Sequence, residues 1–87
     1  MKTKEEVKYM RERVLKLVIT FHTTAHAMAM EQACRKENLP GRLIPVPRAI
    51  SAGCGLSWCA DISDRQVLEA FLKDSRIETE GIYETLV

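Results

Sequence analysis

A cysteine between two glycines is the pattern in this chain with the clearest chemical potential. Cys54 stands between Gly53 and Gly55, six residues after Arg48 in a loop that begins at Pro47. Flanking glycines leave backbone N–H groups uncovered and permit conformations closed to other residues, so the main chain could cradle an anion at the sulfur. The charge of Arg48 would act in the same direction. Such surroundings favour the thiolate, the reactive form of cysteine, and predict an accessible nucleophile.

The other two cysteines are expected to be unreactive. Positions 34, 54 and 59 form no C-x-x-C pair, which argues against a disulfide framework and against a four-cysteine zinc site. Along an extended strand, Cys59 is too far from Cys54 for a disulfide to form without rearrangement. Cys34 falls on the apolar stripe of a predicted helix. Cys54 therefore has no neighbouring thiol that would resolve a sulfur adduct as a disulfide.

Four strands are predicted from the hydrophobic pattern. Apolar residues alternate with other residues over 15–21 and again over 55–62, and a last strand is expected over 82–87. A short strand over 42–46 contains Pro45, which cannot donate a ladder hydrogen bond, so this strand is expected at an edge of the sheet.

Two helices are predicted between these strands. The first begins at a Thr23 or Thr24 cap and runs to about residue 38. The second begins at a Ser63 cap and runs to about residue 75. The apolar positions at helical spacing are expected to face the core. They are Ala27, Met30, Ala33 and Cys34 in the first helix, and Val67, Leu68 and Phe71 in the second.

This order of elements predicts an α+β domain over residues 15–87. The compact solution is a four-stranded antiparallel sheet with both helices on one face, which is the ferredoxin-like βαββαβ arrangement. A charged N-terminal extension over 1–14, expected to form a short helix or a partly disordered lead, precedes the domain. With a right-handed first crossover, the end of the first strand and the loop after the second strand lie at the same edge. Residues 21–24 would then face the loop that carries Cys54.

The start of the first helix would add anion-binding groups beside the thiol. A helix N-terminus presents free N–H groups and about half a positive charge. His22 and His26 lie there with the capping threonines, although capping and packing explain the histidines at least as well as acid–base chemistry does. A metal site made of His22, His26 and Cys54 would lack a fourth ligand. We therefore expect no metal and no cofactor.

The composition of the chain limits the classes of partner that it could bind. The chain has 87 residues, 46% apolar and 29% charged, and its 13 Lys and Arg against 12 Asp and Glu give a formal charge of +1. This balance argues against nucleic acid and membrane surfaces as partners. No apolar run approaches the roughly 18 residues of a membrane span, and the N-terminus lacks the apolar core of a secretion signal. A cytoplasmic location is expected.

A longer motif surrounds the cysteine. Residues 47–55 read P-R-x-x-S-x-x-C-G after the run R-L-I-P-V-P over 42–47, and Leu56 follows. Over roughly residues 15–87 the chain resembles small bacterial domains described as selenium/sulfur carrier-like. The resemblance implies that Cys54 is the carrier residue, with Arg48, Ser51 and Gly55 at matched motif positions. The C-P-x-P signature of related small sulfurtransferases is absent, so the resemblance does not extend to their mechanism.

The function expected from these features is sulfur or selenium carriage. Cys54 would hold a persulfide or selenopersulfide, taken from a donor such as a cysteine desulfurase and given to a small sulfur-transfer acceptor protein. This is a carrier or at most a sulfurtransferase-like activity, because no signature of a stand-alone enzyme is present. The candidate site consists of Cys54 as the reacting residue and, around the bound sulfur, Arg48, Ser51, Gly53, Gly55, His22, Thr23, Thr24 and His26.

An interaction or regulatory module is the alternative function. In that case Cys54 would only fill a tight turn, and a surface on the open side of the sheet or along an edge strand would bind a partner. Val18 and Tyr83, on the pleat opposite the predicted core, would form that surface. A homodimer is one arrangement that would use it.

Overall fold

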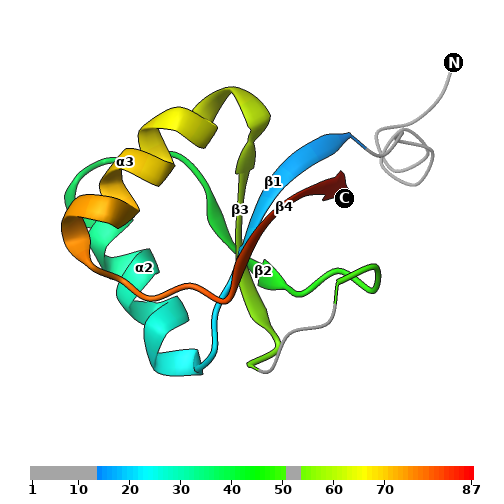
Figure 1. Cartoon of the computed structure of the whole chain (residues 1–87), viewed down its shortest axis with the longest axis horizontal. Coiled ribbons are helices and arrows are strands. Elements are labelled where there is room, and N and C mark those ends of the chain that lie inside the picture. Colours follow the sequence, from blue (N-terminus) through cyan, green and yellow to red (C-terminus); the bar gives the residue numbers. More distant parts are fainter. Residues whose placement is uncertain (1–13, 51–53) are drawn as a thin grey trace, which may run out of the picture.

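A four-stranded antiparallel sheet carries both helices on one face (Figure 1). The computed structural model describes residues 14–50 and 54–87. The ferredoxin-like α+β arrangement predicted from the element order is confirmed, whereas the predicted N-terminal helix falls on residues 1–13 and lies outside the described residues. The elements are β1 (Leu15–Thr20), α2 (Thr24–Lys36), β2 (Arg42–Pro45), β3 (Leu56–Asp61), the 3₁₀ helix η1 (Ile62–Asp64), α3 (Arg65–Ser75) and β4 (Gly81–Leu86).

The strand order β2-β3-β1-β4 decides which loops meet. β1 pairs with β3 and with β4, and Thr20 at its end lies opposite both Ser57 and Gly81. β2 lies at an edge, as its proline predicted. Because β1 and β2 are both antiparallel to β3, they run parallel to each other, and the segments that follow them leave the same edge of the sheet.

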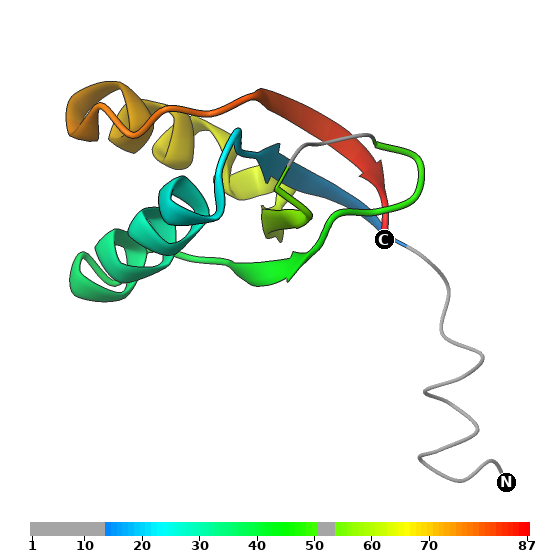
Figure 2. The same ribbon diagram turned by 90° about the horizontal axis from the view of Figure 1, so that it is seen from below.

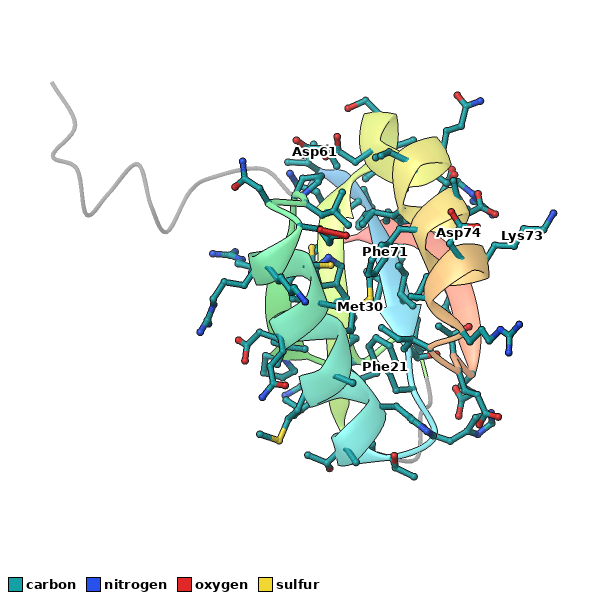
Figure 3. All side chains as sticks on the ribbon, turned by 90° about the vertical axis from the view of Figure 1, so that its left-hand side faces the viewer. Phe21, Met30, Asp61, Phe71, Lys73 and Asp74 are labelled. Atoms are coloured by element: carbon teal, nitrogen blue, oxygen red, sulfur yellow. The ribbon has the colours of Figure 1, made fainter. Side chains whose placement is uncertain are left out.

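The core lies between the sheet and the two helices. Phe21, Met30 and Phe71 gather there in Figure 3, and the first two are fully buried. Burying a large apolar side chain contributes about 1.5–3 kcal/mol each, so this layer holds both helices on the sheet. The other members of the buried cluster are Leu17, Ile19, Ala27, Cys34, Trp58, Ala60, Leu68 and Leu72.

The start of α3 differs from the sequence-based expectation. Residues 62–64 form a 3₁₀ turn, α3 begins at Arg65, and no side chain caps it, so the predicted Ser63 cap is wrong. Val67 is also not part of the buried stripe, because its side chain is 46% exposed. The buried face of α3 consists of Leu68 and Leu72, one turn apart, with Phe71 beside them.

The side of the sheet away from the helices is also covered. Figure 2 shows the loop after β2 passing along this side, and Ile50 in that loop is buried. Val18, on this face, has no exposed surface at all, and its cross-strand neighbour Cys59 is 7% exposed. The prediction that Val18 forms part of an open partner surface is therefore wrong. Tyr83 remains 38% exposed.

No helix of the described residues is long and apolar enough to cross a membrane.

Candidate functional site

Cys54 lies at the end of the loop that joins β2 to β3. The Val46 N–H donates to the Gly55 carbonyl at 3.0 Å, which closes this loop directly beside the cysteine. Gly55 has a φ of +79°, in the left-handed region that glycine adopts at little cost. The chain therefore turns at Gly55 before it enters β3, and Cys54 is held next to the first residue of that strand.

Two hydrogen bonds to Leu56 fix the Cys54 sulfur. The thiol donates to the Leu56 carbonyl at 3.1 Å, and the Leu56 N–H donates to Sγ at 3.4 Å. The N–H contact would stabilise negative charge on the sulfur, whereas the carbonyl contact is favourable only while the thiol keeps its proton. Of the two contacts, the Leu56 N–H is therefore the one that suits a thiolate.

The three thiols differ in accessibility. Cys54 is half-buried, whereas Cys34 is 1% and Cys59 7% exposed, and all three are unpaired. Burial raises the pKa of Cys34 to about 11. Burial also raises the pKa of Cys59, and the nearby charges of Lys16 and Arg42 only partly oppose this effect. Cys54 is thus the one cysteine that combines access with a main-chain N–H donor.

The loop between β1 and α2 leaves the sheet at the same strand ends as the loop that carries Cys54. Thr20 lies opposite Ser57, and the exposed residues His22, Thr23 and Thr24 follow. Thr23 is the N-cap of α2, and its Oγ1 accepts a hydrogen bond from the His26 N–H at 3.2 Å. Among the described residues, no hydrogen bond joins this loop to Cys54. What the two loops share is the end of the sheet at which β1 ends and β3 begins.

We expect Thr23→Ala to lower the free energy of unfolding by about 1 kcal/mol, because the cap would lose its acceptor. Thr23→Ser should restore most of the loss, since serine offers the same oxygen. Urea denaturation followed by circular dichroism measures both variants. An alanine variant as stable as the original chain would contradict this role.

Arg48 is placed away from the Cys54 sulfur. It is exposed in a turn that the Ile50 N–H closes onto the Pro47 carbonyl at 2.9 Å, and it lines a hollow with Leu86 and Val87. Leu86 lies opposite Leu15, at the far end of β1 from Thr20. The described residues contain no hydrogen bond between Arg48 and Cys54. Two more predicted site positions, 51 and 53, lie outside the described residues.

A comparison with protein families identifies the chain. The family model described as Putative Se/S carrier protein-like matches residues 16–84. The chain belongs to this family. The family description supports a general carrier role for this Se/S carrier-like chain. No curated protein and no solved structure gives a match.

The sequence pattern did not predict Glu78 and Glu80 of this Se/S carrier-like chain as neighbours of the candidate site. Glu78 Oε2 lies 4.0 Å from His26 Nε2, and the Thr20 hydroxyl is 3.2 Å from Glu80 Oε1. The Nδ1 atom of His26 is buried without a partner among the described residues. Only the pairing of Thr20 with Gly81 brings these carboxylates to the edge that also carries Cys54.

Metal ligands do not gather in the part of this Se/S carrier-like chain that the structure describes. Within residues 14–50 and 54–87, no group of three or more His, Cys, Asp or Glu side chains could hold a metal ion. His22, His26 and Cys54 all belong to these ranges and form no such group.

Proposed function

We propose that Cys54 carries sulfur or selenium as a persulfide or selenopersulfide and passes it to a partner protein. The observation that carries this proposal is the contrast between the three thiols, since only Cys54 is partly exposed. A carrier residue must reach the reactive groups of two partners in turn. The membership of the chain in a selenium/sulfur carrier-like family supports the same role.

Loading is a sulfane-sulfur exchange. The Cys54 thiolate attacks the outer sulfur of a donor persulfide, R–S–SH, forming a new S–S bond while the donor's S–S bond breaks. Cys54 then holds –S–SH, and the donor leaves as the thiolate R–S⁻. In release, an acceptor thiolate attacks the outer sulfur and Cys54 returns to the thiolate. With selenium as cargo, the outer atom is selenium and the same bonds form and break.

The surroundings of Cys54 suit both steps. The Leu56 N–H, 3.4 Å from Sγ, stabilises the thiolate that leaves in the release step. Cys34 and Cys59 are buried, so neither competes for the cargo. A cysteine desulfurase is a suitable class of donor and a small sulfur-transfer protein a suitable acceptor, because both exchange sulfur through thiols. His22, Thr23, Thr24 and His26 would contact these partners at the shared edge.

The experiment is cyanolysis of the protein after loading. The reduced chain is treated with inorganic polysulfide, desalted and exposed to cyanide, which takes a sulfane sulfur as thiocyanate and leaves the Cys54 thiol. We expect about one thiocyanate per chain and none above background from Cys54→Ser.

The matched control is the double variant Cys34→Ala/Cys59→Ala, which keeps only Cys54 and should load like the original chain. Thiocyanate from Cys54→Ser equal to that from the original chain would place the sulfur elsewhere and reject the proposal.

A further inference from the structure

Exposed apolar side chains occur in β4 and at the neighbouring start of β1. Among the described residues, six large hydrophobic side chains are exposed, and four of them belong to β4 or to the start of the neighbouring β1. Leu15 and Leu86 lie opposite each other and are 46% and 55% exposed. The other two are Val14, at 53% and directly before β1, and Tyr83, at 38% and on the opposite face of β4 from Leu86. Both faces of the sheet therefore expose apolar surface along β4, and contiguous exposed apolar surface often marks an interaction site.

The outer side of β4 is available for strand pairing. β4 has six residues, lies at the end of the strand order and pairs with β1 on one side. Among the described residues, no backbone hydrogen bond reaches its other side. The opposite edge, β2, has four residues and contains Pro45, which protects an edge from pairing. β4 contains neither proline nor lysine, the residues that commonly prevent an edge strand from pairing with another chain. Of the two edge strands, only β4 lacks this protection.

Charge along the β4 edge is arranged for pairing with an identical strand. Glu80, directly before β4, is an exposed residue at one end of the edge, and one of its two carboxylate oxygens, Oε1, accepts a hydrogen bond from the Thr20 hydroxyl at 3.2 Å. Arg48 lines a hollow of about 330 Å³ with Leu86 and Val87 at the other end. When two such edges meet antiparallel about a two-fold axis, the acidic end of each lies beside the basic end of the other. The complementary contact therefore occurs twice.

The remaining charge on β4 is already neutralised within the chain. Glu84 accepts a hydrogen bond from the Arg65 guanidinium at 2.7 Å, and Arg65 also contacts Glu69 at 2.8 Å. Bringing two copies of β4 together would therefore place no unpaired carboxylate at the seam. Like charges facing each other across such a seam would otherwise oppose pairing.

From these features we infer that two copies of this chain pair antiparallel through β4 and form a homodimer with one continuous eight-stranded sheet. The occupant of the edge is a second copy, because the two ends of the edge complement each other in charge and the exposed Leu86 and Tyr83 lie along it. Cys54 lies just before β3, and β1 separates β3 from β4, so the dimer leaves both thiols accessible. This inference does not depend on sulfur carriage.

The test is the molar mass of the reduced full-length chain, measured by sedimentation velocity over a range of concentrations. We expect a dimer with twice the 9.9 kDa chain mass. Leu86→Lys should raise the dissociation constant about tenfold or more, because each substitution acts twice in a two-fold interface. A monomer throughout the concentration range would overturn the inference, as would a dimer that Leu86→Lys leaves unchanged.

Charge reversal tests the orientation of the two strands. Arg48→Glu and Glu80→Lys should each weaken the dimer, and the combined variant should restore it, because the swapped charges again complement each other across the axis. Glu37→Lys, the same charge change at the end of α2, is the matched control and should leave the dimer intact. Far-UV circular dichroism verifies that each variant is folded. A combined variant weaker than both single variants would overturn the antiparallel arrangement.

Discussion

Iodoacetamide is expected to modify Cys54 of the folded chain at least a hundredfold faster than Cys34 at pH 8. The pKa of the Cys34 thiol stands at about 11 instead of its ordinary 9.0, because burial penalises the charged form. At a pH below both values, this difference leaves Cys34 with about a hundredfold less thiolate than a cysteine of ordinary pKa would have. Cys59 should also be slow, since burial raises its pKa and leaves it 7% exposed. Peptide mapping by mass spectrometry follows each cysteine separately.

The unfolded chain is the control for this labelling. In concentrated urea the three cysteines lose their different surroundings and should react at similar rates. Raising the pH toward 11 should keep increasing the rate at Cys34, because the thiolate fraction of a group grows about tenfold per pH unit until the pH reaches its pKa, which is about 11 for Cys34. Equal labelling of Cys34 and Cys54 in the folded chain at pH 8 would contradict the burial of Cys34.

Gly41→Ala should destabilise the domain by about 3 kcal/mol or more, which is a large fraction of the roughly 5–15 kcal/mol that stabilises a typical domain. Gly41 has a φ of +116°, and an added Cβ would lie 2.7 Å from Trp58 Cε2 and 2.8 Å from the Cys59 carbonyl oxygen. Trp58 is fixed in place, because its indole N–H donates to the Pro40 carbonyl at 3.1 Å. Backbone strain and overpacking therefore add. Urea denaturation followed by Trp58 fluorescence measures the loss.

Gly55→Ala is the matched control, since Gly55 also has a positive φ, of +79°, but an added Cβ would meet nothing within 4 Å. Only the backbone cost of about 1 kcal/mol should remain. If the two alanine variants lose the same stability, the close approach of Gly41 to Trp58 does not affect the free energy of unfolding, and the predicted overpacking at Gly41 is wrong.

Local pattern predicted most of the sheet, because strand alternation and helix capping depend on near neighbours. Leu17 and Ile19 face the core as their alternation predicted, and Thr23 caps α2. The errors at Ser63 and Val67 also have a local cause. Ser63, the predicted cap, is part of a 3₁₀ turn that precedes α3. The helix faces the core through Leu68 and through Leu72, one turn further along. Periodicity alone does not distinguish neighbouring stripes of an amphipathic helix.

The parts of the site that escaped prediction depend on contacts between distant residues. The burial of Val18 accompanies a loop that passes on the far side of the sheet, and no pattern within β1 reveals the path of that loop. The same path takes Arg48 to the end of β4. Glu80 reaches the Cys54 edge only through the pairing of β1 with β4. Cys54 could be singled out because its flanking glycines are a local feature.

Intact-mass spectrometry of the reduced chain, after incubation with a cysteine desulfurase and cysteine, tests sulfur carriage most directly. We expect a gain of about 32 Da per sulfur atom in the original chain and in Cys34→Ala/Cys59→Ala, with peptide mapping placing it on Cys54. Cys54→Ser should show no gain. A folded original chain that gains no mass from the desulfurase, or a Cys54→Ser variant that gains as much, would contradict the assignment of Cys54 as the carrier residue.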